Sequence, residues 1–207
     1  IAFCEREKLG IDFVTYHAYG LSHGHFDEFG TENFILSPKP EMITEVMERV
    51  YKEVNSSSRP DLEIHMTEWG ASYSSRDSLH DGYVSAAYVL YKLKQCEGLA
   101  DSMSYWTFSD IFEETGPAPR PFHGGFGLLN MQGLAKPQYY SYQWLNRLGE
   151  EELDCEDSNA WACRDNNGGA QVLLWDYTYL EQDSPNREFY AKELPAQSAG
   201  PVDVSLD

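Results

Sequence analysis

The feature that most constrains the fold is a series of β-type runs, each followed by a segment of helical periodicity. In the central run Leu62, Ile64 and Met66 alternate with polar residues, which is the pattern of a strand. The expected strands are residues 11–20, 62–67 and 102–108, and the helices that follow them are residues 43–54, 79–93 and 137–148. Strand and helix pairs in series predict an α/β fold with a parallel sheet, in which both faces of the strands are apolar.

Aromatic and charged side chains gather where the expected strands end. His17 and Tyr19 lie near the end of the first strand, Glu68 and Trp69 follow the second, and Trp106 lies near the end of the third. In an α/β barrel the carboxyl ends of the strands open on one face, so this set would converge on one pocket. Glu68 is therefore a candidate nucleophile or general acid, and the alternative is a solvated loop carboxylate.

Two groups around Glu68 have expected roles. His17 and Tyr19 would donate hydrogen bonds that keep Glu68 ionised, unless they form a core pair satisfied by the backbone. An acidic loop follows Trp106, and its Glu113 and Glu114 would accept hydrogen bonds from sugar hydroxyls.

Asp110 opens that loop, and either touches the substrate or caps a turn. A carboxylate among aromatic rings and further carboxylates favours glycoside chemistry.

The charge balance excludes several classes of partner. With 15 Lys and Arg against 34 Asp and Glu, the formal net charge is −19, which repels nucleic acids and anionic membrane surfaces and suits a neutral substrate. The sequence contains no apolar run of about 20 residues that would span a membrane, and no signal peptide is visible, so the compartment stays open. We expect no cofactor. His23, His25 and Asp27 could be drawn as metal ligands, but we expect no metal, because they share one flexible loop (residues 21–30) without fixed geometry.

The character of the chain changes near residue 150. Residues 160–164 and 170–178 are β-type runs separated by a turn signal, residues 187–194 resemble another strand, and residues 150–157 form an acidic linker. We therefore expect two domains, residues 1–149 and residues 150–207, the second being the start of an antiparallel β domain. Cys155 and Cys163 either bridge a hairpin there or remain free thiols.

The motifs DFVTYHAYG (residues 12–20), HMTEWG (65–70), YWTFSDIFEE (105–114) and PFHGGFGLLN (121–130) resemble glycoside hydrolase family 39. The resemblance covers about residues 10–180 and implies a (β/α)8 barrel followed by a β-sandwich, and hydrolysis with retention through two glutamates. It implies a β-xylosidase that releases xylose from the non-reducing end of xylo-oligosaccharides. Matched by position, Glu68 is the nucleophile, and the sugar subsite is lined by His17, Tyr19, Trp106, Glu113 and Glu114.

One departure from the family is large. Its acid/base glutamate lies in an Asn-Glu-Pro triplet, which does not occur in these 207 residues. The chain is therefore expected to be the C-terminal part of the barrel followed by the start of the sandwich, with the N-terminal half of the barrel as its missing partner. Alone, it should be inactive and expose apolar strand faces that drive association, including homo-oligomers.

Two alternatives stay open. The family also contains α-L-iduronidases, but a uronate needs a cation, whereas this loop presents Glu113 and Glu114. A non-catalytic carbohydrate-binding fragment is the other alternative, and the absent acid/base supports it for the isolated chain.

Overall fold

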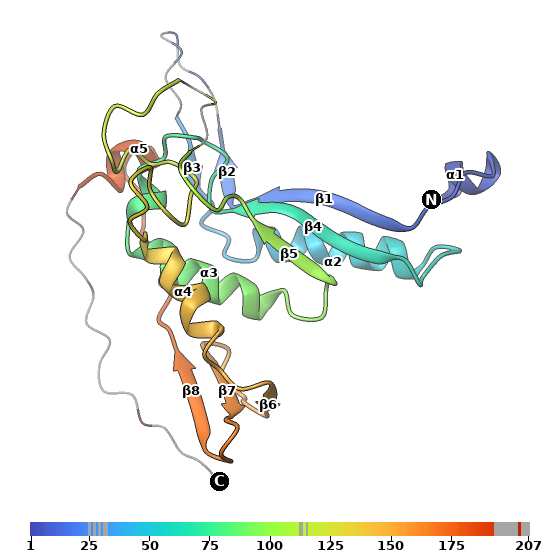
Figure 1. Cartoon of the computed structure of the whole chain (residues 1–207). Coiled ribbons are helices and arrows are strands. Elements are labelled where there is room, and N and C mark those ends of the chain that lie inside the picture. The colour runs from blue at the N-terminus through green and yellow to red at the C-terminus, as the bar shows by residue number, and fades with distance from the viewer. Residues whose placement is uncertain are drawn as a thin grey trace.

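A computed structural model describes residues 1–24, 26, 28, 30, 33–111, 114, 116–192 and 203 (Figure 1). Its centre is a parallel sheet of three strands, β1 (Phe13–Tyr19), β4 (Glu63–Gly70) and β5 (Ser102–Tyr105), with β4 in the middle. Parallel neighbours must be joined by a crossover, and α2 (Met42–Asn55) and α3 (Val84–Gln95) supply the two crossovers. The predicted parallel α/β arrangement is confirmed.

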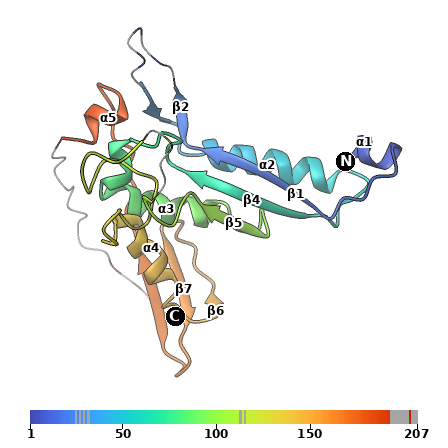
Figure 2. The same ribbon diagram turned by 45° about the horizontal axis from the view of Figure 1, so that its top comes forward.

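The helices α2 and α3 cover one face of this sheet (Figure 2). Met47 of α2, Met66 and Trp69 of β4, and Val89 of α3 are almost completely buried in one apolar cluster. Burial of apolar surface is the main favourable term in folding, so this cluster is what holds the sheet to its helices.

The opposite face of the sheet is open and largely polar. Thr15, Glu63 and Thr67 are exposed there, and Phe13 retains 54% of its surface accessible to solvent. The prediction that both strand faces are apolar is therefore wrong, because only the residues that face the helices are uniformly apolar.

Two strand boundaries differ from those expected. β4 continues through Glu68 to Gly70, where Gly70 is paired with Tyr19, so Glu68 lies inside the strand and not after it. β5 ends at Tyr105 and not at Phe108, because Thr107 and Phe108 turn to a different partner. Their carbonyls accept hydrogen bonds from the backbone N–H groups of residues 128 and 129, at 3.0 Å each.

The expected helix at residues 79–93 is broken into two. A short 3₁₀ helix, η1 (Ser78–Asp81), is capped by Asp77, whose side chain accepts from the N–H of Leu79 at 3.0 Å. Gly82 then adopts an extended conformation, and α3 begins at Val84. The next helix, α4 (Pro137–Leu145), starts as predicted with proline at its first position, but ends three residues before the expected residue 148.

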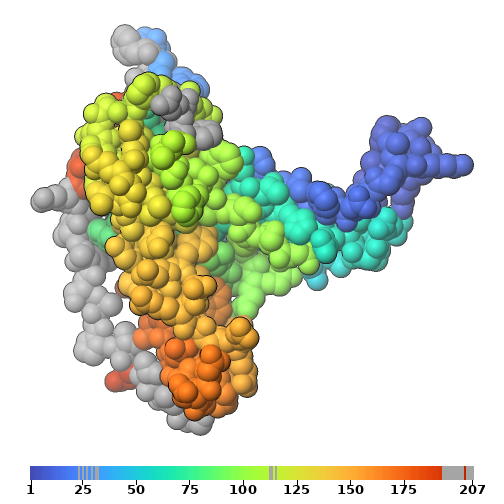
Figure 3. Space-filling view, in the orientation of Figure 1, coloured from blue at the N-terminus to red at the C-terminus, as the bar shows by residue number. Residues whose placement is uncertain are grey.

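Smaller elements flank the sheet. Helix α1 (Ala2–Arg6) projects with the N-terminus away from the body (Figure 3). Strands β2 (Leu21–His23) and β3 (Ile35–Leu36) form an antiparallel pair, so the predicted loop at residues 21–30 is wrong at its start. His25 and Asp27 lie outside the described residues. Among the helices that the structure describes, none has the length and apolar character to cross a membrane.

The C-terminal part contains an antiparallel sheet of β6 (Glu151–Leu153), β7 (Ala160–Arg164) and β8 (Ala170–Leu174). The predicted hairpin between β7 and β8 is confirmed. The predicted linker is wrong in part, because β6 falls within it and pairs with β7. All four cysteines are free thiols, so Cys155 and Cys163 form no bridge.

The prediction of a strand at residues 187–194 is wrong where the structure describes this segment. Residues 187–189 belong to helix α5 (Asn186–Phe189). The side chain of Asn186 explains the difference. It accepts from the N–H of Leu36 at 2.8 Å and donates to Asp77 Oδ2 at 2.7 Å, both across long sequence separations. These tertiary bonds, made with residues of the N-terminal part, are invisible to local β propensity.

A buried lysine lies on α3. Lys92 is only 1% exposed, and its ammonium donates to Gln95 Oε1 at 2.9 Å and lies 5.0 Å from the centre of the Tyr91 ring. Burial disfavours the charged form and lowers the pKa of Lys92 to about 8. The unfolded chain would keep this proton up to the ordinary lysine value of 10.5.

We therefore expect Lys92→Met to change how stability depends on pH. Between pH of about 8 and 10.5 the unfolded chain binds a proton that the folded chain has released, so the free energy of unfolding of the wild type rises with pH. Lys92→Met has no such proton, so its rise should be smaller. Denaturant unfolding of the full-length protein at about pH 7.5 and about pH 9.5 measures this, and equal changes in both proteins would contradict it.

Candidate active site

The side chain of Glu68 is held by two residues of the neighbouring strand. The hydroxyl of Tyr19 donates to Glu68 Oε2 at 2.9 Å, and Nδ1 of His17 lies 3.1 Å from the same oxygen. His17 is the direct neighbour of Glu68 in the parallel ladder, so the pairing of β1 with β4 brings these groups together. The expected contacts are present, and the alternative of a core pair satisfied by the backbone does not describe His17, whose side chain is 51% exposed.

A bulge in β4 decides which way Glu68 points. Tyr16 pairs with Met66 and His17 pairs with Glu68, so two residues of β4, Thr67 and Glu68, oppose one step of β1. Without this shift, strict alternation would place Glu68 on the helix side with Met66. The bulge instead turns Glu68 to the open face beside His17, with its side chain 24% exposed.

Tyr19 is kept in its protonated form. Burial raises the pKa of the Tyr19 hydroxyl well above its usual value, and the hydrogen bond to Glu68 and the charges of Glu68 and Glu114 raise it further. Tyr19 is therefore a hydrogen-bond donor throughout the neutral pH range. The same effect shows that Glu114 lies near enough to act on Tyr19 by its charge.

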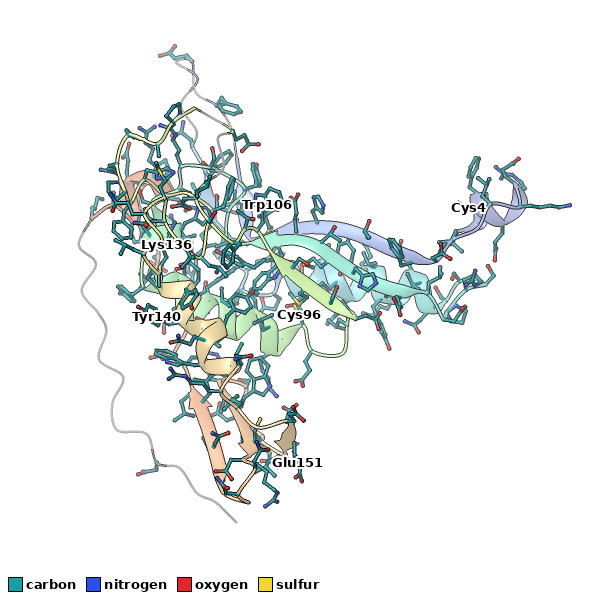
Figure 4. All side chains as sticks on the ribbon, in the orientation of Figure 1. Cys4, Cys96, Trp106, Lys136, Tyr140 and Glu151 are labelled. Carbon is teal, nitrogen blue, oxygen red and sulfur yellow. The ribbon has the colours of Figure 1, made fainter. Side chains whose placement is uncertain are left out.

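Trp106 lies at the end of β5, next to the strand that carries Glu68 (Figure 4). Its backbone N–H donates to the carbonyl of Trp69 at 3.0 Å, and its half-buried ring packs edge-on against Phe126 at 6.5 Å. Trp69 itself is completely buried in the core and cannot meet a ligand.

The acidic residues of the loop after Trp106 lie in different surroundings. Glu114 is exposed, and Glu113 lies outside the described residues. Asp110 is buried and accepts from the N–H of Gly127 at 2.6 Å, so of the two alternatives it is the cap within the loop.

Sequence reasoning missed the partner of Asp110. Lys136 is completely buried and lies 2.7 Å from Asp81 and 3.3 Å from Asp110. The glycine-rich run at residues 124–127 was the one local signal, because closely spaced glycines indicate a backbone that packs tightly against its neighbours. The long separation from Asp110 to Lys136 carries no signal by itself.

The arrangement provides a carboxylate at the carboxyl ends of parallel strands and beside an indole. Its Oε2 accepts a hydrogen bond from Tyr19 and lies 3.1 Å from Nδ1 of His17. A carboxylate fixed in this way is suited to attack an electrophilic carbon. Within the described part of the chain, no three His, Cys, Asp or Glu residues are grouped so that they could hold a metal ion. Fold and site together define an α/β protein whose candidate active site lies at the carboxyl ends of its strands.

Residues 1–202 match the family described as Glycosyl hydrolases family 39, and the chain belongs to this family. A β-xylosidase of Geobacillus stearothermophilus is 35% identical over 188 residues, which are 90% of this chain and 37% of that protein.

Solved structures agree with this assignment. The crystal structure of a monomeric β-xylosidase from Caulobacter crescentus CB15 matches with a TM-score of 0.87 and 42% identity. The match covers 94% of this chain and 39% of the chain of that enzyme. For a family 39 enzyme from Xanthomonas axonopodis pv. citri the TM-score is 0.88 and the identity 43%, over 94% of this chain and 38% of its own. The chain thus spans less than two fifths of the length of each relative.

The contact between Tyr19 and Glu68 can be tested through the pKa of Tyr19. Glu68→Gln removes the negative charge and weakens the hydrogen bond, so the pKa of Tyr19 should fall, although burial still keeps it above 10.0. NMR titration of ring-labelled tyrosine would follow the resonance that is missing in Tyr19→Phe. Tyr16, on the helix side of β1, serves as the control: burial raises its pKa to about 12, and its titration should be the same in both proteins. An unchanged titration of Tyr19 would contradict the contact.

Proposed function

We propose that this chain is part of a retaining β-xylosidase, in which Glu68 is the nucleophile. The observation that carries the proposal is that Tyr19 and His17 both contact Oε2 of Glu68 at the strand ends. The names of the relatives from Geobacillus stearothermophilus and Caulobacter crescentus support the substrate class. The substrates would be xylosides and xylo-oligosaccharides, cleaved at the non-reducing end.

The geometry supports a two-step mechanism. Tyr19 and His17 hold Oε2 of Glu68, and Oε1 attacks the anomeric carbon while the bond to the leaving oxygen breaks. A second carboxyl group protonates that oxygen, and the sugar is left as an ester of Glu68. Water, deprotonated by the same second group, then attacks the anomeric carbon and releases xylose with its configuration retained.

The second carboxyl group is assigned outside this chain. The family's Asn-Glu-Pro triplet does not occur in the 207 residues, and Asp110, which lies in the loop beside the site, is buried in its contacts with Gly127 and Lys136. The acid/base would therefore come from the N-terminal half of the barrel.

The same half would complete the architecture. We assign residues 1–149 to the C-terminal half of a (β/α)8 barrel and residues 150–207 to the start of a β-sandwich. A parallel sheet that is covered on one face by α2 and α3 supports the first assignment, because the helices of such a barrel form an outer ring around its strands. The antiparallel sheet of β6, β7 and β8 supports the second.

Around Glu68 the charges favour a neutral sugar. Glu114 is close enough to raise the pKa of Tyr19 by its charge, and the carboxylate of a uronate would be repelled by both Glu114 and Glu68. A neutral pentoside meets no such repulsion. Trp106 would offer an apolar face to the sugar ring, and Glu114, with Glu113, would accept from its hydroxyls.

Glu68→Gln tests the role of the nucleophile in the full-length protein. The amide keeps the shape of the side chain but cannot form the ester, so turnover of an aryl β-xyloside should fall by about 10³-fold or more. Glu63→Gln is the matched control, since Glu63 lies at the start of the same strand and is bonded to His65, away from the site. Wild-type turnover in Glu68→Gln, or equal losses in both variants, would refute the assignment.

The isolated chain provides a second test. Residues 1–207 alone should hydrolyse no aryl β-xyloside and should associate in solution, because the outer edges of β1 and β5 lack the neighbouring strands of the barrel. Adding the separately produced N-terminal half should restore hydrolysis. Mass in solution, thermal unfolding and activity would be measured. An active monomer with a cooperative transition would disprove the assignment of the acid/base to the N-terminal half of the barrel.

A further inference from the structure

Lys136 is the centre of a buried ionic cluster outside the sugar site. Its ammonium donates to the carbonyl of Gly125 at 2.7 Å and contacts Asp81 Oδ1 at 2.7 Å and Asp110 Oδ2 at 3.3 Å. Lys136 and Asp110 have no exposed side-chain surface, and Asp81 has little. Two carboxylates that approach one another in a buried place need such a cation between them.

The same carboxylates hold the glycine run. Asp81 Oδ2 accepts from the N–H of Gly124, and Asp110 Oδ1 accepts from the N–H of Gly127, both at 2.6 Å. A Cβ added at Gly124 would lie 2.6 Å from the backbone of Asp77, and one at Gly125 would collide with the carboxylate of Asp110. The motif GGFG (residues 124–127) is therefore held in place by η1, Asp110 and Lys136 (Figure 4 marks Lys136). We call the set of Asp81, Asp110 and Lys136 the clamp.

The clamped segment continues to the sugar site. The backbone N–H of Thr107 donates to the carbonyl of Phe126 at 3.2 Å, and the backbone N–H of Asp110 donates to the carbonyl of Leu129 at 2.8 Å. Residues 107–110 therefore run along residues 126–129. The Phe126 ring, which lies in the clamped segment, packs against the Trp106 ring. Residues 107–110 and the ring of Trp106 thus contact the segment that the clamp holds.

We propose that Lys136 is a positioning residue for the sugar subsite: its charge joins Asp81 and Asp110, and through them and residues 124–127 it sets the place of Trp106 and of residues 107–110. The role rests on the proposed function, because it concerns where the sugar is held. Without the ammonium, the two carboxylates repel each other and lose their common donor, so this rim of the site shifts. Glu68 is held by β1, and its contacts with Tyr19 and His17 do not pass through the clamp.

Lys136→Met in the full-length protein keeps the length of the side chain and removes the charge. We expect kcat/KM for an aryl β-xyloside to fall about 100-fold, with most of the loss in KM, because the sugar-holding groups move while the nucleophile stays. Lys92→Met is the matched control: it removes the other lysine that is nearly fully buried, in the last turn of α3 and bonded to Gln95, and should leave KM within about twofold of the wild type.

A second variant covers the case in which Lys136→Met does not fold. Asp110→Asn keeps the shape of the carboxylate but weakens its attraction to Lys136, so it should also raise KM more than it lowers kcat. A folded Lys136→Met or Asp110→Asn enzyme with wild-type KM would overturn the proposal, and so would an equal rise of KM in Lys92→Met.

Amide hydrogen exchange separates this proposal from the proposed function. Peptides covering residues 107–111 and 124–130 should exchange faster in Lys136→Met than in Lys92→Met, whatever the substrate. If the wild type hydrolyses no xyloside, the proposed function fails while exchange still tests the clamp. Unchanged exchange in these peptides would overturn the clamp even if the enzyme is active.

Discussion

The parallel pairing of β1 with β4 is the constraint on which the rest of the structure depends. It places Tyr19 and His17 beside Glu68, and its register shift at Thr67 turns the carboxylate away from the core. One extra residue in β4 lets Trp69 fill the core while the preceding Glu68 faces the opposite side. A bulge is a small local change, but it exchanges the faces of every later residue in the strand, so the site and the core depend on it together.

The second constraint is electrostatic. A chain with a formal charge of −19 places a lysine at the centre of a buried cluster of carboxylates, next to the loop that leads to the site. A buried ion pair contributes little net stability compared with an apolar core, but breaking one is costly, so it favours one arrangement of its neighbours over others. At Lys136 the neighbours concerned are the glycine run at residues 124–127 and Asp110, in the segment that follows β5.

The helix α5 shows how far the two parts of the chain cooperate. Asn186 follows the antiparallel sheet in sequence, yet its side chain bonds Leu36 and Asp77, which belong to the N-terminal part. Such contacts tie the small sheet's C-terminal extension to the body that carries the site. They also explain why local propensity failed here, since the four residues of α5 are ordered by partners about 110 and 150 positions away.

The sequence by itself determined the parallel α/β order, the helices α2 and α4, the β7 and β8 hairpin, and the family, because hydrophobic periodicity, proline and glycine placement and local motifs are local signals. It also predicted that His17, Tyr19, Glu68 and Trp106 lie at the same edge of the sheet. Only the tertiary structure decided the bulge that aims Glu68, the break between η1 and α3, the helical form of α5 and the partnership of Lys136 with Asp81 and Asp110. Each of these depends on hydrogen bonds or charges between residues far apart in the chain, and such pairings leave no period in the sequence.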